Sequence, residues 1–255
     1  MIQEKAAIIG RRQLSPGVYK YLLSSPGIAR TAAAGQFVQV TAPGFFLRRP
    51  ISICRIDPEA GTLVLVMEVR GSGTAAIAQL GSEDSLDLIG PLGSGFQLAD
   101  PKAHALLVGG GIGVPPLCQA AAHHGANAVV AAGFRSAGAV ILRDEVENLG
   151  ASFLVATDDG TAGHHGLVTD LVKAHLAETK TDVIYACGPM PMLRAVAAIA
   201  KEQGIACQVS LEERMACGMG ACLGCATALL DDNGEQYYGH VCKDGPVFPA
   251  ERVVW

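Results

Sequence analysis

Four cysteines in the C-terminal part of the chain have the spacing of an iron-sulfur site. Cys217, Cys222 and Cys225 follow the pattern C-x4-C-x2-C, and Cys242 supplies a fourth thiol. This spacing is typical of proteins that hold a [2Fe-2S] cluster, which transfers single electrons. A zinc site is one alternative, although zinc usually takes two C-x2-C pairs and only one is present. Buried free thiols are the other alternative. We predict that these four residues are cluster ligands.

Glycines between the cysteines suit a loop that wraps round a cluster. Gly218, Gly220 and Gly224 lie within this short stretch. Glycine reaches backbone angles that are closed to other residues, and it lets main-chain N–H groups approach the sulfur atoms. The loop therefore has the flexibility that four converging thiolates require.

Composition favours a globular protein in a reducing compartment. The 255 residues are 50% hydrophobic and carry a formal net charge of -5, so a substantial core and about two domains are expected. No block of Lys or Arg offers a nucleic-acid surface, and the first residues lack the basic and apolar regions of a leader. The other cysteines lie among apolar neighbours, as buried thiols do: Cys54, Cys118, Cys187 and Cys207. We expect a soluble, cytoplasmic protein with no membrane segment and no nucleic-acid partner.

The first 98 residues have the pattern of a small antiparallel β-barrel. Short β-rich runs are found at 37–41, 51–55, 63–69 and 85–89. Turn residues separate them: Pro43-Gly44, Asp57-Pro58 and Gly90-Pro91. Such a series of short strands closes naturally into a barrel. We predict a β-barrel domain over residues 1–98.

Residues 99–208 change to alternating strands and helices. The strand-like runs are 105–108, 128–132, 152–155 and 183–186, and the helical stretches are 117–123, 143–149, 168–176 and 192–203. Alternation of this kind predicts a parallel sheet with crossover helices. Residues 209–255 form the third part, with the cysteines and a hairpin of 227–230 against 236–238. The predicted fold is thus a barrel, an α/β nucleotide-binding domain and a small [2Fe-2S] lobe.

A glycine-rich loop opens the α/β part. Gly109, Gly110, Gly111, Ile112 and Gly113 join the strand 105–108 to a helix. Residues without side chains let the backbone approach a diphosphate, which a helix N-terminus also favours. The loop departs from the usual dinucleotide fingerprint, because a proline replaces the third glycine and no acidic residue follows the next strand. A structural turn is the alternative to a nucleotide site.

The order of these segments resembles the ferredoxin-NADP reductase superfamily. A barrel is followed by a glycine-loop domain, which carries Cys187, Gly188 and Pro189 after a late strand. Together with residues 211–225, this order looks like the electron-transfer subunit family of NAD-dependent (class 1B) dihydroorotate dehydrogenases. The match spans nearly the whole chain.

The resemblance implies that FAD binds to the barrel through an Arg-x-x-Ser motif. Here the motif is Arg49, Pro50, Ile51 and Ser52. A guanidinium suits the diphosphate because it donates two parallel hydrogen bonds, and the serine hydroxyl is expected near the flavin N5. Ile51 stands where many members of the superfamily have tyrosine. Considered without the resemblance, Arg49 would be expected to be an exposed surface residue, as most arginines are.

A second stretch is assigned to the flavin by the same resemblance. Val66, Met67 and Glu68 are expected to present backbone groups to the ring, and Gly73 and Thr74 an amide and a hydroxyl to phosphate. Considered only as part of a strand, Val66 and Met67 would be expected to pack in the core.

The resemblance places NAD on the α/β domain. It implies that the glycine loop receives the diphosphate, with Cys187, Gly188 and Pro189 beside the nicotinamide and Asp158 at the edge of the cleft. Ser52 and Cys187 are the expected catalytic residues, in the sense of orienting the rings. NAD is preferred to NADP on resemblance alone, because arginines after the second strand suit a 2′-phosphate as well.

Three cofactors in one chain imply a relay. A nicotinamide exchanges a hydride, a cluster exchanges single electrons, and a flavin does both, so FAD is expected between the other two. The family resemblance further implies a separate FMN-containing catalytic subunit that oxidises dihydroorotate in pyrimidine biosynthesis, in a heterotetramer of two plus two. The alternatives are the flavin subunit of a ferredoxin:NAD(P)H oxidoreductase or sulfide-dehydrogenase-like complex and, from another class, a redox-sensing module without turnover.

Overall fold

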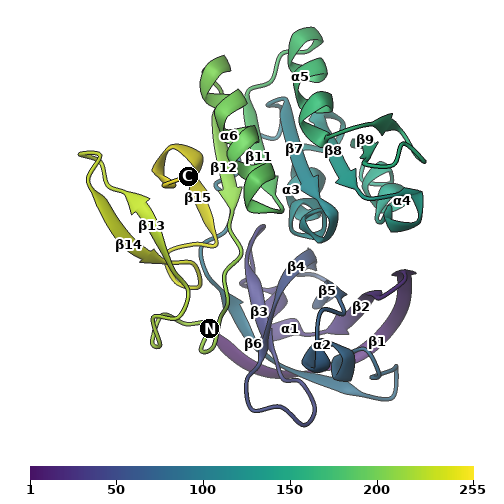
Figure 1. Ribbon diagram of the computed structural model, residues 1–255. Coiled ribbons are helices and arrows are strands. Elements are labelled where there is room, and N and C mark those ends of the chain that lie inside the picture. Colours follow the sequence, from purple (N-terminus) through teal and green to yellow (C-terminus); the bar gives the residue numbers. More distant parts are fainter.

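A closed six-stranded barrel forms the lower part of the molecule in Figure 1, which shows the computed structural model of residues 1–255. The strands follow the order β1-β2-β5-β4-β3-β6 round the barrel, all antiparallel. Their bounds are β1 Ile2–Ser15, β2 Val18–Ser24, β3 Phe37–Val40, β4 Arg49–Asp57, β5 Thr62–Glu68 and β6 Ser85–Leu92. Two short helices lie in the connections, α1 Pro26–Ala29 and α2 Ser72–Ile77.

Alternating burial explains why these strands close on one another. Every second residue of β6 is buried, as expected for a strand with one face on a core. The turn predicted at Gly90-Pro91 is wrong, because both residues lie within β6 and Gly90 pairs with Ile2 of β1. A Cβ on Gly90 would meet Val38 at 2.6 Å, so this glycine lets two strands approach closely.

A seven-stranded sheet forms the upper part, in the order β10-β9-β8-β7-β11-β12-β15. The strands are β7 Ala105–Gly110, β8 Ala128–Phe134, β9 Ser152–Thr157, β10 His164–His165, β11 Val183–Cys187, β12 Ala206–Ser210 and β15 Val247–Pro249. All are parallel except β15, which runs antiparallel to β12. The carboxyl ends of β7 and β11 therefore meet at one edge.

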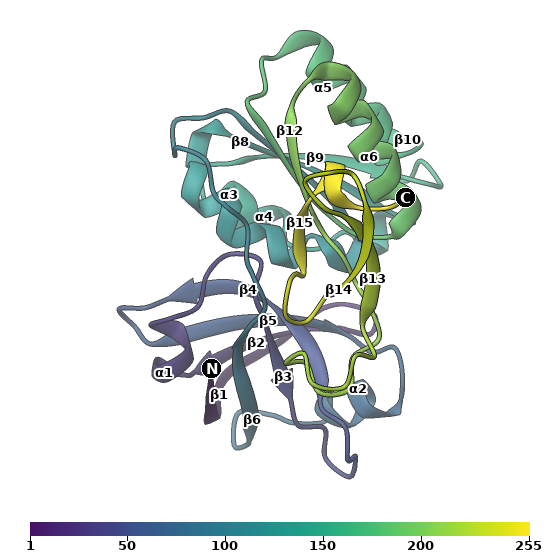
Figure 2. The same cartoon turned by 90° about the vertical axis from the view of Figure 1, so that its left-hand side faces the viewer.

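Helices cover both faces of this sheet. The longer ones are α3 Cys118–His124, α4 Arg143–Glu147, α5 Val168–Glu178 and α6 Met190–Gln203, and the short 3-10 turns are η1 Gly111–Gly113, η2 Pro115–Leu117, η3 Gly125–Asn127, η4 Ala137–Ala139 and η5 Ala250–Arg252. Leu107 of β7 packs in a core with α3 and α4, whereas its neighbour Leu106 packs with α5 and α6. Figure 2 shows the two helix layers on either side of the sheet. No helix combines the length and apolar character needed to cross a membrane.

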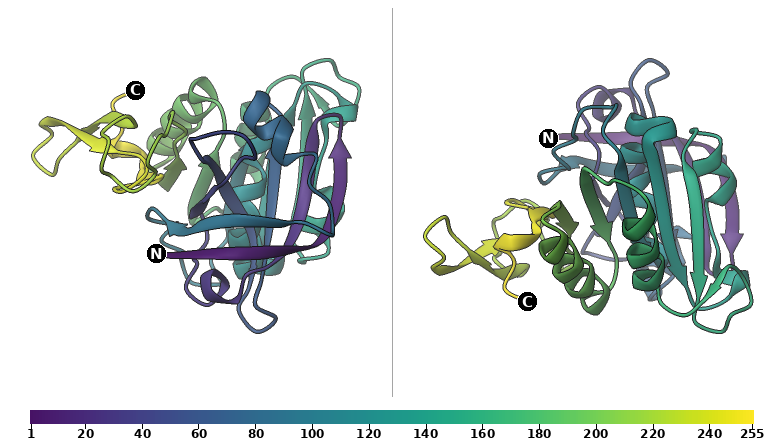
Figure 3. Two further views of the ribbon diagram at one scale, coloured as in Figure 1. Left: turned by 90° about the horizontal axis from the view of Figure 1, so that it is seen from below. Right: turned by 90° about the horizontal axis from the view of Figure 1, so that it is seen from above.

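The C-terminal segment lies beside both larger parts, as Figure 3 shows in yellow. It contains the cysteine loop and the hairpin β13 Ala226–Leu230 with β14 Gln236–His240. The segment then returns to the large sheet as β15, and Pro246 forms a bridge to Ser94 after the barrel. The pairing with the large sheet and the bridge to Ser94 thus fix the position of the C-terminal segment.

The predicted fold class is confirmed, and so are the four helices and the hairpin. Strands β1, β2, β10, β12 and β15 were not among the predicted runs. The bounds 1–98, 99–208 and 209–255 remain a proposal for the domain division, because β15 joins the sheet of the second part.

Candidate functional site

A cleft opens where the barrel, the large sheet and the C-terminal segment meet. The barrel contributes Pro50, Ile51 and Ser52 of β4, Val66, Met67 and Glu68 of β5, and Thr74 of α2; the sheet contributes Ile112, Pro115 and Cys187; the segment contributes residues Ser210 to Glu213 and Met215. Predicted flavin and nicotinamide residues therefore line one continuous space.

The strand alternation in the barrel decides what faces the cleft. Ile53 is fully buried in the barrel core, so its half-buried neighbour Ser52 points to the opposite face, where the cleft lies. Met67 also belongs to the barrel core, and it meets the cleft with its main chain. Val66 packs outside that core, on the side of the large sheet.

The Arg49 side chain lies against the start of α2. Its Nη1 donates to the carbonyl oxygen atoms of Leu47 at 2.6 Å and Arg48 at 3.2 Å, and the guanidinium stacks over the ring of Phe45 at 5.2 Å. A Cβ on Gly73 would lie 2.2 Å from Nη2 of Arg49. No carboxylate pairs with this cation, so its charge is available to an anion.

The Thr74 hydroxyl closes the loop before α2. It accepts hydrogen bonds from the N–H groups of Arg70 at 2.9 Å and Gly71 at 3.2 Å, and it donates to the carbonyl of Gly71 at 3.0 Å. The structure thus brings Arg49, Gly73 and Thr74 together, as predicted from the sequence resemblance. Arg49 itself lies next to the cleft rather than in its lining.

The glycine loop is packed against the end of β11. A Cβ on Gly113 would meet the carbonyl oxygen of Cys187 at 2.2 Å, and one on Gly110 would meet Pro189 at 2.7 Å. Gly188 has φ +154, and a Cβ on it would lie 3.0 Å from the main-chain nitrogen of Gly110. The close approach of these two segments is therefore the reason for most of the glycines.

One glycine of the loop has a different environment. Gly111 has φ +54 and nothing within 4 Å of a Cβ placed there, whereas Gly109 is buried against Val114. The backbone of Gly111 is consequently open to a ligand. Ile112, its neighbour, reaches the cleft.

The Cys187 thiol is a neutral group. Burial, followed by the nearby negative charge of Glu212, raises its pKa to about 12, against a smaller opposing effect of a hydrogen bond with Ser210. A thiol with this pKa is protonated at neutral pH and does not act as a nucleophile. Its expected role beside a ring is therefore contact and orientation.

Asp158 is separated from these residues. It follows β9 at the same edge of the sheet, where its N–H donates to the carbonyl of Phe134 at 3.0 Å. The side chain is exposed and does not line the cleft. The structure therefore does not bring Asp158 together with Cys187.

The cysteine loop is folded round its own sulfur atoms. Cys217 Sγ accepts from the N–H groups of Met219 at 3.4 Å, Ala221 at 3.3 Å and Cys222 at 3.4 Å. Burial opposes the effect of these donors, but together with the Cys222 thiol they lower the pKa of Cys217 to about 6. Donors to sulfur are typical of sites that hold thiolates.

The four thiols are arranged as two pairs, which fits a two-iron cluster. The Cys222 N–H donates to Cys217 Sγ at 3.4 Å, and the Cys242 N–H donates to Cys225 Sγ at 3.4 Å. Burial and then the Cys225 thiol raise the pKa of Cys242 to about 12 in the absence of metal. Two irons take two thiolates each, which suits two pairs of cysteines.

Sequence reasoning did not identify several residues of the site. Glu212, Met215, Phe37 and Pro246 also line the cleft. The nearness of 211–215 to Cys217 is a signal that could have identified the first two. Nothing in the sequence marks Pro246, because its place depends on the return of the chain to the sheet.

Comparisons with known proteins cover the whole chain. A family model described as the iron-sulfur cluster binding domain of dihydroorotate dehydrogenase B matches residues 212–254, and one described as an oxidoreductase NAD-binding domain matches residues 107–198. The dihydroorotate dehydrogenase B (NAD(+)) electron transfer subunit of Listeria welshimeri is 41% identical, over 99% of both chains. That of Geobacillus thermodenitrificans is 40% identical, over 99% of this chain and 98% of the relative.

Solved structures give the same fold. An NADH-dependent reduced ferredoxin-NADP oxidoreductase, described in work on flavin-based electron bifurcation, superposes with a TM-score of 0.86 at 29% identity and covers 99% of this chain and 90% of its own. A ferredoxin NADP+ reductase from Neisseria gonorrhoeae has a TM-score of 0.64 at 17% identity, over 80% of this chain and 91% of its own. The second likeness concerns the fold alone.

Proposed function

This chain belongs to the family of electron-transfer subunits of NAD-dependent dihydroorotate dehydrogenase B, and on that premise we propose the residues and the partner through which it works. The cleft carries the proposal, because one space is lined by the barrel, the glycine-loop domain and the residues that lead into the cysteine loop. A flavin in that cleft would touch the binding regions of both other redox groups. When bound, flavin supplies the exchange between hydride and single-electron transfer.

We propose that the barrel holds FAD. The unpaired guanidinium of Arg49 and the first turn of α2 at Gly73 and Thr74 suit the diphosphate. Ser52 of β4 and the main chain of Met67 face the cleft and would orient the ring. The residues Pro50, Ile51, Val66 and Glu68 complete this wall.

We propose that NAD binds across the carboxyl edge of the sheet. The open backbone of Gly111 suits the diphosphate, and the neutral Cys187 thiol with Gly188 and Pro189 would hold the nicotinamide against the flavin. Asp158 is proposed for a more distant part of the dinucleotide, because it lies two strands away from β7.

We propose that Cys217, Cys222, Cys225 and Cys242 bind the [2Fe-2S] cluster. The two thiol pairs and the main-chain donors to sulfur support this assignment. The loop leads directly from Met215 in the wall of the cleft. The residues between cleft and cysteines thus offer a short connection for electrons.

We propose that the partner is an FMN-containing catalytic subunit, in a heterotetramer of two plus two. The relatives are named as subunits. Residues 1–255 build a six-stranded barrel, a seven-stranded sheet and a hairpin, none of which is the (β/α)8 barrel that the family resemblance implies for dihydroorotate and FMN.

Anaerobic purification of the chain tests the cofactor assignment. We expect FAD, two irons and two labile sulfides per chain, and NADH oxidation with an artificial dye. Cys222→Ala should lose iron, because the cluster would have an incomplete ligand shell, and should retain FAD. Full iron and sulfide in that variant, or FMN in place of FAD, would contradict the assignment.

A second candidate function follows from the likeness to the NADH-dependent ferredoxin-NADP oxidoreductase. That protein is 29% identical to this chain, whereas the two dihydroorotate dehydrogenase B subunits are 41% and 40% identical, which favours the first function. Reduction of NAD+ by dihydroorotate with the partner present supports the first function, and reduction by ferredoxin alone supports the second.

A further inference from the structure

A buried glutamine lies between the barrel and the cysteine loop. Gln39 is on β3, where Val38 and Val40 face the barrel core. Because side chains alternate along a strand, Gln39 and Phe37 face outward, and Phe37 belongs to the same hydrophobic cluster as Cys225 and Cys242. Gln39 is nevertheless 0% exposed, since the C-terminal segment covers it.

The Gln39 amide touches the cysteine loop directly. Gly218 follows the first cysteine and has φ +72, and a Cβ built on it would lie 2.4 Å from Nε2 of Gln39. The Nε2 end of the amide is therefore turned toward the loop. Any residue other than glycine at position 218 would collide with it.

Neither polar atom of this amide has a partner. Nε2 and Oε1 are both buried and without a hydrogen bond. Buried amides almost always find partners, because an unmet donor loses its hydrogen bonds to water without compensation. The burial of Gln39 under the loop therefore points to an acceptor at this place.

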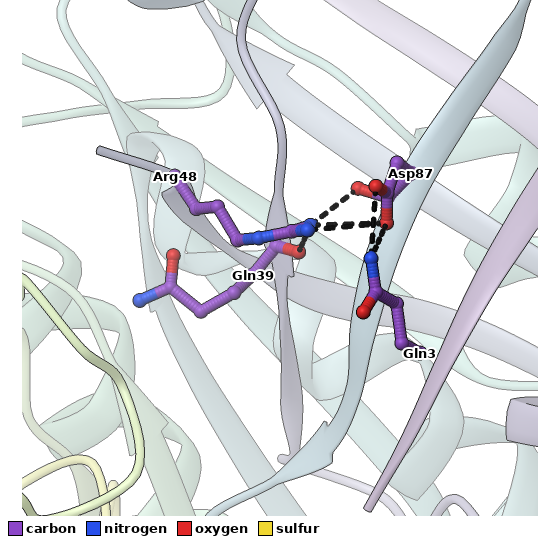
Figure 4. Close-up of polar contacts among 4 residues, drawn as sticks. All are labelled: Gln3, Gln39, Arg48 and Asp87. Carbon is purple, nitrogen blue, oxygen red and sulfur yellow. Dashed lines mark hydrogen bonds and ion pairs between the residues drawn. The ribbon is translucent and has the colours of Figure 1, made fainter. Parts of the chain in front are cut away.

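Neighbouring polar groups are occupied elsewhere. Arg48 donates to the backbone carbonyl of Gln39 at 3.4 Å and pairs with Asp87 at 3.2 Å, and Gln3 binds the same carboxylate. Figure 4 shows the Gln39 side chain extending away from this group. The acceptor must therefore come from the other side, where Gly218 lies.

None of the cysteine sulfur atoms accepts a hydrogen bond from this amide. We propose that Nε2 of Gln39 donates a hydrogen bond to a sulfide of the [2Fe-2S] cluster and thereby raises the reduction potential of the cluster. This inference rests on the cluster site of the proposed function. A hydrogen bond to sulfur stabilises the more negative, reduced cluster, which raises its potential.

The position of Gln39 connects the two redox sites. It pairs with Pro50 of β4, which lines the cleft proposed for the flavin. A hydrogen-bond donor at this position would stabilise the reduced cluster, and it would not contact the flavin. The potential of the cluster could thus be adjusted separately.

The test is a redox titration of the holoprotein, followed by the electron paramagnetic resonance of the reduced cluster. Gln39→Met has a side chain of similar length but no donor. We expect wild-type iron, sulfide and FAD and about a tenfold smaller equilibrium constant for cluster reduction, which corresponds to about 59 mV for one electron. The flavin potential should not change.

Gln119→Met is the matched control. Gln119 also lies between barrel and sheet, where its Oε1 accepts from Ile56 N–H at 3.0 Å, and Ile56 is in β4, away from the cysteine loop. This variant should leave the cluster potential unchanged. A wild-type cluster potential in Gln39→Met with full cluster content would overturn the inference, and so would an equal shift in both variants.

A measurement on the unaltered chain covers the case in which Gln39→Met loses its cluster. In protein labelled with 15N only at glutamine side chains, hyperfine spectroscopy of the reduced cluster should show a weak 15N coupling. Absence of that coupling in cluster-loaded protein overturns the role of Gln39 alone. Wild-type protein without iron and sulfide would overturn the cluster site itself, and this inference with it.

Discussion

At the scale of single residues, the contact between Arg49 and Gly73 permits a sharp test of the FAD site. A Cβ at position 73 would lie 2.2 Å from the mobile end of the Arg49 side chain, so Gly73→Ala should displace the guanidinium without unfolding the barrel. The loss of its charge-assisted hydrogen bonds is expected to cost about 1.5–3 kcal/mol, or roughly 10- to 150-fold in the Kd of FAD. Flavin fluorescence during titration of the flavin-free protein measures this Kd.

Gly71→Ala is the control for that substitution. Gly71 has an extended backbone and nothing within 4 Å of an added Cβ, so FAD affinity should stay close to wild type. Arg49→Ala should reproduce the loss seen in Gly73→Ala. Undiminished FAD affinity in both of these variants would remove Arg49 from the site.

The cysteines differ in ionisation, which predicts a pattern of alkylation in protein freed of its metal. The pKa of Cys217 is lowered to about 6 and that of Cys187 is raised to about 12. Labelling of Cys217 by iodoacetamide should therefore rise through about pH 6 and level off above it, because the thiolate is the reactive form. Cys187 should stay unlabelled up to pH 9 in the folded chain. Mass spectrometry of tryptic peptides measures the labelling of Cys217 and of Cys187. Equal labelling of the two cysteines at pH 7 would contradict the difference between their pKa values.

At the scale of elements, the glycine loop and the end of β11 form one unit. An alanine at 113 would place its Cβ 2.2 Å from the main-chain carbonyl of Cys187, and main chain cannot swing aside as a side chain can. Gly113→Ala is expected to destabilise the fold by roughly 1–3 kcal/mol and to raise the KM for NADH. Gly138→Ala, in an open position, should do neither. Thermal unfolding measures the stability of each variant, and NADH:dye kinetics measure its KM. Wild-type stability and KM in Gly113→Ala would mean that the loop moves independently of β11.

The elements that could be predicted from sequence are those with local signals. Continuous apolar runs marked β7, β8 and β11, and the cysteine spacing marked the cluster loop. The long strand β1 was missed because its burial alternates over only part of its length. β15 has three residues and exists through its pairing with β12, which no local pattern reveals.

The candidate site divides in the same way. Its cysteines, glycines and the Arg49 motif have recognisable spacing, and the resemblance gave them roles. Gln39 has no motif, because a buried amide acquires its meaning from a segment that is distant in sequence. Only the folded chain brings Gln39 to Gly218.

At the scale of the whole molecule, turnover of dihydroorotate should require a second polypeptide. The purified chain is expected to oxidise NADH with dyes and to leave dihydroorotate untouched, because the proposed substrate site lies on the partner. Adding the catalytic subunit should produce dihydroorotate:NAD+ activity. Such activity in the chain alone, with no partner detected by mass spectrometry, would contradict this division of labour.

The surface for that partner is expected to include the cluster loop, so that electrons enter by a short path. Leu223 and Met219 project from it with 61% and 42% of their surface exposed. Leu223→Glu should weaken co-purification with the catalytic subunit by at least tenfold while iron content stays at wild-type level. Tyr238→Glu changes an equally exposed residue on β14 and should have little effect. Intact co-purification of Leu223→Glu would place the surface elsewhere.

The return of the chain to the sheet as β15 changes how the cluster region relates to the rest. It leaves from β12 and comes back beside β12, so residues 211–246 are an insertion between two adjacent strands and are tethered at both ends. Replacing residues 211–246 with those of a relative would therefore keep both strands of this sheet edge, although the segment also contacts Gln39 of the barrel and Ser94 after it. Cutting the chain after Ser210 would instead leave the edge of β12 uncovered and prone to pair with other chains. The cluster segment is thus built into the edge of the sheet and cannot simply be cut off.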